Sequence, residues 1–212
     1  PSLALESLAK MQGFDTSASH TAYADAYNSL MILRIIKNKH KDNWERFLKT
    51  STKASVETLL KREGIYSIFE NVKGRNMMYL ACTLHPNHCF HERYESWGYL
   101  WDCRRNPEPF LDLSVNQLRD TLKNFSPKAL RVLKTNKAPI VLDKEFALKQ
   151  KPYSDLELST ILKRAKMVRE NEKFCKNIQT INREIADEKE QTKSQEDIVQ
   201  EETLYEKFIP NK

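Results

Sequence analysis

The sequence lacks any long hydrophobic run. No stretch of about 18 consecutive apolar residues occurs, and this is the length that a helix needs to cross a bilayer. No positively charged start leads into an apolar segment of the kind that directs secretion. We therefore predict that nothing in these 212 residues spans a membrane, and we expect a cytoplasmic protein that acts as a monomer.

Cysteine is also scarce. The sequence has four cysteines, at uneven spacing: Cys82, Cys89, Cys103 and Cys175. Small disulfide-stapled domains carry more cysteines at a higher density, so this number and spacing exclude that class. In a reducing compartment we expect all of them to be free thiols.

Hydrophobic residues make up 40% of the chain, which is enough to bury a core in one or two domains. Lys and Arg outnumber Asp and Glu by 35 to 29, and the resulting charge of +6 gives a pI near 9.0. This balance suits an anionic partner such as nucleic acid. It is equally compatible with a lysine-rich, soluble surface, and both interpretations stay open at this point.

The first 41 residues have helical periodicity. An apolar stripe closed by Gly13 predicts a short helix: Leu3, Leu5, Leu8 and Met11. A second stripe predicts a longer helix with a basic end: Ala22, Ala26, Leu30, Leu33 and Ile36. Its N-cap candidates are Asp15, Thr16, Ser17 and Ser19. The first residue is Pro1 rather than Met, so we expect the chain to begin inside a longer protein.

Between residues 65 and 141 the pattern changes to short β-branched and aromatic runs separated by turn residues. The predicted strands are Ile65–Phe69, Met77–Thr83, Tyr99–Cys103, Ala129–Leu133 and Ile140–Val141. Ser114 is a helix N-cap signal, so one helix should interrupt them. Short strands of this kind predict a small, curled, mostly antiparallel barrel.

The chain becomes helical again after Pro152, where Ser154 is the candidate cap of a helix with an apolar face. Residues 178–200 are dominated by Glu, Lys, Asp and Gln, which predicts a solvated helix or a linker. Near the end, Tyr205, Phe208 and Ile209 are expected to pack on something that these residues do not include.

Several motifs together resemble the exodeoxyribonuclease I family. The first is the run from Pro1 to Leu8 followed by Gly13 to Tyr27, which is similar to the last motif of that family's nuclease domain. Further matches follow in the same order: Tyr79-Leu-Ala, Leu84-His-Pro-Asn87, Leu111-Asp-Leu-Ser114, Leu130-Arg-Val-Leu133, Asn136-Lys-Ala-Pro-Ile-Val-Leu142, Arg169-Glu-Asn171 and Leu204-Tyr205. The resemblance covers nearly the whole chain, and the order and spacing of the motifs carry its specificity.

This resemblance implies an α+β chain in three parts. Residues 1–41 would be the C-terminal end of a ribonuclease-H-like α/β exonuclease domain. Residues 42–150 would form a Src-homology-3-like β-barrel domain with inserted helices. Residues 151–212 would begin a helical domain and its linker.

The implied activity is that of a magnesium-dependent 3′→5′ exodeoxyribonuclease that digests single-stranded DNA in repair and recombination. By similarity His20 is the general base and Asp25 a ligand of one of two Mg²⁺ ions. The residue types suit phosphodiester hydrolysis, because imidazole titrates near neutral pH and hard cations prefer carboxylate oxygens. Five residues along a helix turn about 140°, so His20 can share a cleft with Asp25 only from the loop or first turn ahead of the helix.

One departure from the family is an absence. The resemblance implies an Asp-x-Glu pair and a further Asp ahead of Pro1, and these 212 residues do not include them. One carboxylate cannot hold two metal ions, so we expect the chain by itself to be inactive. A second departure is Ala4, where the family often has a basic residue that faces DNA.

The barrel region mixes cations with aromatic residues, as grooves for single-stranded DNA do. We predict Arg75 and Tyr79 as nucleic-acid-binding residues, and we expect at least one of Trp97 and Trp101 to be a core residue. A single-stranded-DNA-binding protein whose tail docks on this family is a further candidate partner.

Two alternatives remain. The first is a non-catalytic module that binds single-stranded DNA or an acidic partner. The second is a structural zinc protein, suggested by a cluster of soft ligands: Cys82, His85, His88, Cys89, His91 and Cys103. The spacing does not fit the common zinc patterns, and it favours a hairpin with partly buried thiols and exposed imidazoles.

Overall fold

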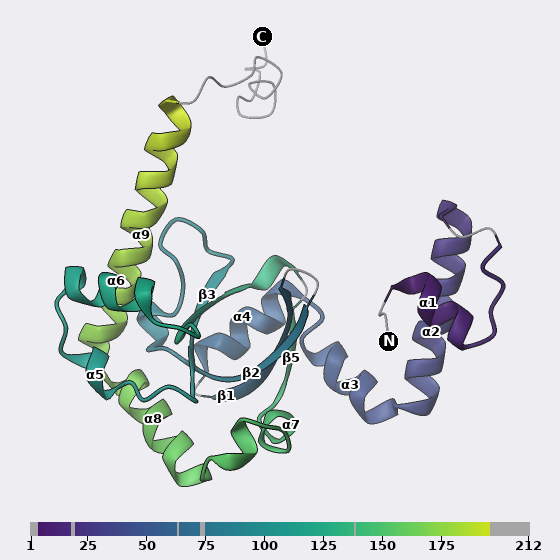
Figure 1. Ribbon diagram of the computed structural model, residues 1–212, viewed down its shortest axis with the longest axis horizontal. Coiled ribbons are helices and arrows are strands. Elements are labelled where there is room, and N and C mark those ends of the chain that lie inside the picture. The colour runs from purple at the N-terminus through teal and green to yellow at the C-terminus, as the bar shows by residue number, and fades with distance from the viewer. Residues whose placement is uncertain (1–3, 18–19, 63, 73–74, 138, 196–212) are drawn as a thin grey trace.

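The structure is a computed structural model, and it describes residues 4–17, 20–62, 64–72, 75–137 and 139–195. For residues 71, 72, 75, 76 and 193–195 the description is limited to the backbone. Figure 1 shows a helical arm at the N-terminal end and a larger body of sheet and helices. No helix in the described ranges is long and apolar enough to cross a membrane.

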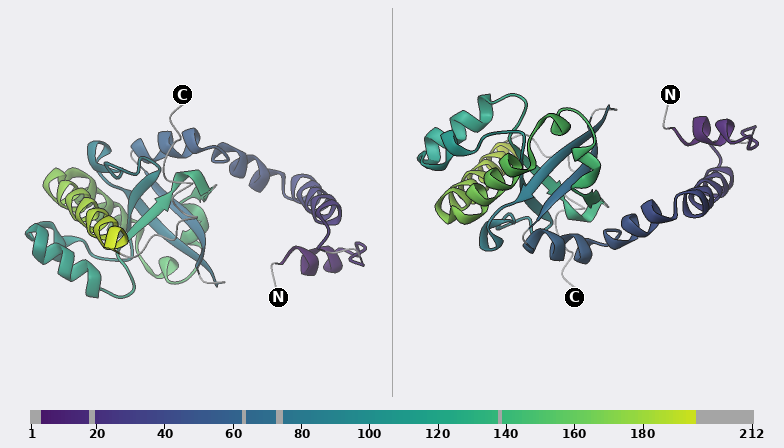
Figure 2. Two further views of the ribbon diagram at one scale, coloured as in Figure 1. Left: turned by 90° about the horizontal axis from the view of Figure 1, so that it is seen from above. Right: turned by 90° about the horizontal axis from the view of Figure 1, so that it is seen from below.

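The arm consists of α1 (Leu5–Met11), α2 (Ala22–Lys39) and α3 (Lys41–Lys49). Figure 2 shows that α1 and α2 extend away from the body in both views. Helix α1 ends as predicted at Gly13, whose φ of +76° is a conformation that glycine adopts without strain. The N-cap of α2 is Thr21, whose side chain accepts a hydrogen bond from the N–H of Ala24 at 3.2 Å.

The predicted caps of α2 were therefore placed too early. Asp15 accepts a bond from the N–H of Ser17 at 2.8 Å and closes a local turn instead. Competing polar residues upstream of a helix make the choice of N-cap uncertain from sequence, because each can satisfy a backbone donor.

Helix α4 (Lys53–Lys61) links the arm to the body. A capping box between Thr52 and Ser55 begins it, and Val56 and Leu60 enter the core. Leu60 packs on Gly98 of the sheet so closely that a β-carbon at position 98 would collide with it.

The body contains a five-stranded antiparallel sheet in the order β4-β3-β2-β1-β5. The strands are β1 (Ile65–Val72), β2 (Arg75–Thr83), β3 (Trp97–Asp102), β4 (Leu130–Lys134) and β5 (Ile140–Asp143). The predicted strands are thus confirmed, with boundaries that differ by a few residues. Within the described residues β4 and β5 do not pair, so the ladder is open between its two ends.

Shorter helices fill the connections. They are η1 (Pro86–His88), α5 (Glu108–Leu111), α6 (Val115–Asn124), η2 (Thr135–Lys137), α7 (Glu145–Leu148) and η3 (Tyr153–Asp155). Ser114 caps α6 as predicted, in a capping box with Gln117. Ser154 does not act as a cap, because it lies inside η3, and α8 (Leu158–Glu170) begins after Glu157 without a side-chain cap.

Helix α9 (Glu172–Gln195) corrects the prediction for the charged segment. It is a helix, but one face of it belongs to the core, where Phe174, Cys175, Ile178 and Ile181 are buried. In Figure 2 this helix lies against the sheet on the side away from the arm. The composition of the segment suggests an exposed helix, because it combines the many polar residues of the solvent-exposed face with the few apolar residues of the buried face.

Aromatic rings form the centre of the core between the sheet and α9. Trp101 is fully buried and meets the rings of Phe110 and Phe174 edge-on, with centroids 5.1 and 5.6 Å away. The prediction that at least one of the two tryptophans is a core residue is confirmed by Trp101. The domain limits at 41 and 150 stay a prediction.

Arg169 of α8 joins the helices to the sheet. Its guanidinium donates to the carbonyls of Lys61 and Arg62 at 3.3 and 3.1 Å, where α4 ends. It also donates to the Thr83 hydroxyl and to the carbonyl of Leu84 at 3.3 Å, where β2 ends. Nearby, Asn171 accepts from the N–H of Phe174 at 2.9 Å and so caps α9.

Replacing Arg169 by Met should lower the free energy of unfolding by about 3 kcal/mol, because several carbonyls lose a charged donor. Urea unfolding followed by circular dichroism measures this. Arg183→Met is the matched control: Arg183 pairs with Glu92 on the surface, so its loss should cost less than about 1 kcal/mol. Equal losses in the two variants would contradict the role given to Arg169.

Candidate functional site

His20 lies in the turn directly ahead of α2, where the sequence predicts it. Its backbone is left-handed, with φ of 74°, a conformation that costs energy for any residue with a side chain. In this conformation the N–H of His20 donates to Oδ1 of Asp25 at 3.3 Å. Asp25 stands in the first turn of α2, so the turn folds back over its carboxylate.

The two predicted residues are therefore in contact, but the contact is made by the main-chain N–H of His20 and not by its imidazole ring. The imidazole is almost fully exposed, at 85%, and is free to meet a partner from outside. Its Nε2 lies 3.7 Å from Oε2 of Glu6 on α1. The sequence analysis missed Glu6, because only the packing of α1 on α2 brings it to His20.

The carboxylate of Asp25 is half-buried at the start of a helix and offers hard oxygen ligands of the type that Mg²⁺ prefers. It fits the role of one ligand. Among the described residues, no group of three possible metal ligands forms around it. The described residues therefore do not form a complete metal site at Asp25.

An apolar face of α2 is left open to solvent. Tyr23 is 81% exposed, and its ring stacks on that of Tyr27 with centroids 6.4 Å apart. Leu30 continues this face one turn further, and Leu33 and Ile36 are also exposed but lie on other sides of the helix. Contiguous exposed apolar surface of this kind usually marks an interface.

The two predicted DNA-binding residues have different outcomes. Arg75 opens β2, and its side chain lies outside the described residues. Tyr79 is only 2% exposed, and the guanidinium of Arg131 covers its ring at 4.8 Å from the centroid. Burial raises the pKa of its hydroxyl. Its ring has no open face on which a base could stack.

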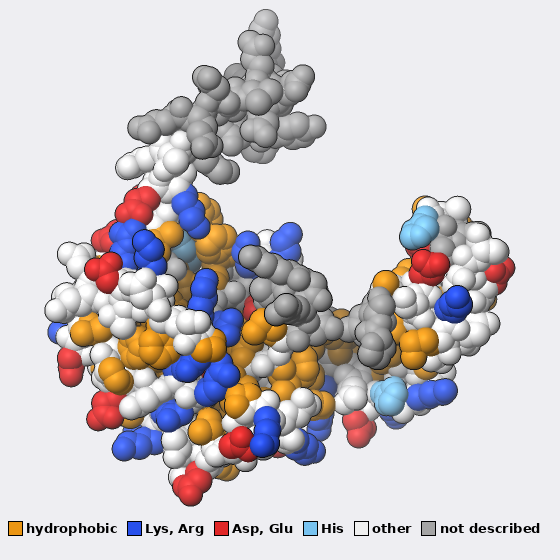
Figure 3. All heavy atoms as spheres, viewed as in Figure 1, with side chains coloured by type: hydrophobic (Ala, Val, Ile, Leu, Met, Phe, Trp, Pro, Cys, Tyr) orange, Lys and Arg blue, Asp and Glu red, His pale blue; other side chains and the backbone are white. Residues whose placement is uncertain are grey.

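Other cation and aromatic pairs lie on the body. Lys134 of β4 lies over the ring of Trp97 at 4.8 Å, and Arg105 lies over Phe125 at 5.3 Å. Trp97 is half-buried and Lys134 is exposed. On the side of the molecule drawn in Figure 3, several Lys and Arg side chains lie across the middle of the body. Sequence reasoning missed Arg131 and Lys134, although both stand in the Leu130-Arg-Val-Leu133 run or directly after it.

The cysteines are buried, free thiols. Cys89 donates to the carbonyl of Pro86 and Cys175 to that of Val168, both at 3.2 Å. Burial raises the pKa of each of these two thiols to about 11. They are therefore protonated at neutral pH and are poor ligands or nucleophiles.

The histidines of the same region are less exposed than predicted. His91 is 3% exposed, and its Nδ1 accepts from the N–H groups of Arg93 and Tyr94 at 3.0 and 3.2 Å. Burial lowers its pKa, which keeps the ring neutral. His85 and His88 are half-buried. The six residues of the suggested zinc cluster therefore do not meet at one point. The thiols are buried, His91 is held by backbone hydrogen bonds, and His85 and His88 form a separate pair.

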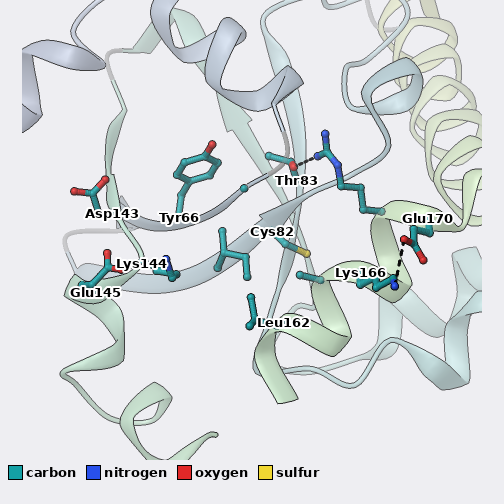
Figure 4. A pocket seen from close by; sticks show the side chains of 13 residues that line it. Tyr66, Cys82, Thr83, Asp143, Lys144, Glu145, Leu162, Lys166 and Glu170 are labelled. Carbon is teal, nitrogen blue, oxygen red and sulfur yellow. Dashed lines mark hydrogen bonds and ion pairs between the residues drawn. The ribbon is translucent and has the colours of Figure 1, made fainter. Parts of the chain in front are cut away.

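A groove of about 880 Å³ lies between the sheet, α7 and α8. Figure 4 shows Tyr66, Lys144, Leu162 and Lys166 around it. Leu162 is 49% exposed, so the groove has accessible apolar surface beside two ammonium groups. Lys166 pairs with Glu170 at 3.8 Å and Lys144 with Glu145 at 3.1 Å. Arg169 also borders the groove, but backbone carbonyls occupy its guanidinium.

A thiol reagent tests the burial of the cysteines. At about pH 8, where an exposed thiol near its ordinary pKa reacts readily, the folded chain should show no fast-reacting group. All four thiols should react in concentrated guanidinium chloride. The pKa values of Cys89 and Cys175 are higher in the folded chain than in the unfolded chain. The contribution of these thiols to the free energy of unfolding is therefore fully present below the pKa of an unfolded thiol, and it is lost as the pH rises towards 11. One rapidly titrating thiol in the native protein would contradict this description.

No protein-family model matches the chain, and no curated protein matches it. Solved structures of Escherichia coli exonuclease I do. A zinc-bound complex of that enzyme with single-stranded DNA is 20% identical over 85% of this chain, with a TM-score of 0.62. A complex with the SSB C-terminal segment is 18% identical over the same share, with a TM-score of 0.63.

A third structure, described as suggesting how exonuclease I achieves processivity, is 19% identical over 85% of this chain, with a TM-score of 0.60. The chain covers 40 to 41% of the length of these three structures. At this identity the likeness is one of fold. The described arm, sheet and helices have the fold of about two fifths of exonuclease I.

Proposed function

We propose that this chain is the part of a 3′→5′ exodeoxyribonuclease for single-stranded DNA that carries His20 and Asp25. One observation carries the proposal: the main-chain N–H of a left-handed His20 donates to the carboxylate of Asp25 at the start of α2, which keeps the two residues together. This pair stands within a chain whose fold matches exonuclease I over 85% of its length. The activity would belong to DNA repair and recombination.

The roles follow from the chemistry of the two side chains. Asp25 would hold one of two Mg²⁺ ions, which would supply positive charge to stabilise the charge that develops at the phosphate. His20 acts as the general base that takes a proton from the attacking water. Its exposure allows this, because the ring can reach a nucleotide that enters from outside the arm.

The proposed reaction needs carboxylates beyond Asp25, since one cannot hold two ions. We infer that a longer protein supplies them on a domain that covers the apolar face of α2. The exposed rings of Tyr23 and Tyr27 support this inference, because isolated helices rarely present such a face to water. The chain by itself should bind DNA weakly and should not cut it.

The body would guide the strand towards the arm. Lys134 is an exposed cation that would neutralise a phosphate of the strand, whereas the Trp97 ring beneath it already contacts Lys134 and Tyr94. Arg75 remains a candidate for the same strand. Tyr79 contributes indirectly, as the buried ring on which Arg131 rests.

Digestion of end-labelled single-stranded oligonucleotides by the longer protein tests the proposal. With a 3′ label the radioactivity should be released at once, and with a 5′ label the product should shorten gradually. His20→Ala and Asp25→Asn should each lower kcat by at least about 100-fold, the usual contribution of a general base or a metal ligand.

His40→Ala is the matched control, because His40 is also exposed on the arm but lies at the other end of α2. It should leave the rate unchanged. Undiminished digestion by the His20 variant would remove the mechanism. Strand binding without any cleavage would instead favour a binding module.

The groove between the sheet and α8 supports a second part of the proposal, a protein partner. An acidic peptide tail with an apolar end would take the place of Glu145 and Glu170 at the ammonium groups of Lys144 and Lys166, and its apolar end would contact the exposed side chain of Leu162. One of the similar structures is a complex with the SSB C-terminal segment. We infer that the tail of a single-stranded-DNA-binding protein docks here.

Reversing both charges, Lys144→Glu with Lys166→Glu, should weaken the binding of a fluorescent acidic peptide by about tenfold or more, and added salt should weaken binding to the native chain. Fluorescence anisotropy measures both effects. Lys123→Glu with Lys128→Glu, which lie at a different groove beside α6, is the control and should bind as the native chain does. Equal loss in the control pair would show that only net charge matters.

A further inference from the structure

A tight turn brings two histidines to one side of the body. The residues Pro86–His88 form the short helix η1, and His85 precedes it as its N-cap. The ring centroids of His85 and His88 are 5.8 Å apart. Helix α9 begins directly beside this turn, and its first residue is Glu172. The three side chains converge although 84 residues separate His88 from Glu172.

The spacing of their donor atoms suits a small metal ion. One nitrogen or oxygen from each of His85, His88 and Glu172 lies within 4.8 Å of the others. Nε2 of His88 and Oε1 of Glu172 are 3.3 Å apart. Two ligands of a tetrahedral zinc ion, each about 2.0–2.1 Å from the metal, lie about 3.4 Å apart, so this pair already has the required separation.

The orientation of His88 is fixed by Gln179. The amide nitrogen of Gln179 donates to the carbonyl of Phe90 at 3.0 Å, which turns its oxygen towards His88. That oxygen can only accept a hydrogen bond and lies 2.9 Å from Nδ1 of His88, so Nδ1 carries a proton. Nε2 is then the nitrogen that faces the carboxylate of Glu172. Either a proton on Nε2 or a metal ion between the two groups satisfies both of them, and zinc titration distinguishes these two states.

We propose that His85, His88 and Glu172 bind a divalent transition metal, zinc by the chemistry of the ligands. Imidazole and carboxylate together suit zinc, whereas Mg²⁺ prefers oxygen ligands alone. Gln179 is a positioning residue that holds His88 by its other nitrogen. Water would complete the tetrahedron, because Glu172 is 61% exposed and the site is open at its edge.

The buried thiols take no part in this site. Their hydrogen bonds to carbonyls and raised pKa values keep Cys89 and Cys175 protonated, and among the described residues only the two histidines and Glu172 meet the spacing. His85 must release one weak contact, the 3.3 Å bond that its Nδ1 accepts from the N–H of Asn87. The loss of a single long hydrogen bond is small beside the energy of metal coordination.

The ion would tie the turn after β2 to the start of α9. Arg169 and Leu84 make the neighbouring connection, so the metal would reinforce the same junction. Binding to the folded chain alone raises its stability by mass action. The site lies on the body, away from His20 and Asp25, and does not depend on the proposed nuclease activity.

Zinc titration of the chelator-treated chain tests the proposal, with a competing metal indicator for affinity and the melting temperature as a second readout. The native chain should bind one equivalent with a raised melting temperature. His88→Ala and Glu172→Gln should weaken zinc binding at least about tenfold and abolish the shift, and Gln179→Leu should weaken it about 10- to 100-fold.

His40→Ala is the matched control and should bind zinc as the native chain does, because His40 is exposed on the arm. Circular dichroism of each metal-free variant establishes that it is folded. Glu172→Gln changes only an exposed side chain, and this variant should therefore stay folded and give a clear result. No zinc uptake by the native chain would overturn the proposal and leave an imidazolium pair of His88 with Glu172. Equal uptake by native chain and variants would overturn it as well, as adventitious binding.

Discussion

The guanidinium of Arg169 satisfies main-chain carbonyls at the end of α4 and at the end of β2, and the arrangement of the body depends on it. Carbonyls at the end of a helix lack partners within that helix, and burying them without donors is costly. One side chain from α8 meets this need for two elements at once. Asn171 then caps α9, so the run Arg169-Glu-Asn171 sets the position of both C-terminal helices.

Three features adjoin this junction. The groove proposed for an acidic tail has Arg169 on its border, with α8 as one wall. The turn that carries His85 and His88 begins directly after Leu84, whose carbonyl Arg169 binds. The core rings of Trp101 and Phe174 pack where α9 meets the sheet. The two binding surfaces that we propose on the body therefore lie along the junction between its helices and its strands.

The arm is organised differently. Its helices pack mainly on one another, and α2 keeps an exposed apolar face instead of adding to the core of the body. The chemistry assigned to His20 and Asp25 depends on local backbone geometry: the Thr21 cap fixes the start of α2, and a left-handed residue ahead of it turns back to Asp25. The hydrogen bonds of the cap and of this turn both lie between residues 20 and 25.

Much of this structure follows from sequence patterns. Alternating and β-branched runs predicted the strands, and Ser114 predicted the start of α6. The resemblance, which requires His20 and Asp25 to share a cleft, predicted that His20 lies ahead of α2. The burial and contacts of single residues were harder to predict. Tyr79 sits on a strand whose two faces cannot be told apart locally, and it proved to be buried. The buried face of α9 was not predicted, because the overall composition of the segment is dominated by the charged residues of its exposed face.

The sequence could not show contacts between distant segments. Glu6 reaches His20 only because α1 packs on α2, and Glu172 meets His88 only because α9 starts beside the β2–β3 connection. Arg169 appeared in a motif, but its carbonyl partners belong to other elements. These relations depend on tertiary packing, which periodicity and spacing do not encode.

The most direct test of the central claim is a crystal structure of the longer protein with Mn²⁺ and a single-stranded oligonucleotide. We expect anomalous density for a metal within about 2.3 Å of an Asp25 carboxylate oxygen, the coordination distance typical of such ions, with the His20 ring facing the scissile phosphate. Metal bound elsewhere, with His20 turned away from the DNA, would contradict the account.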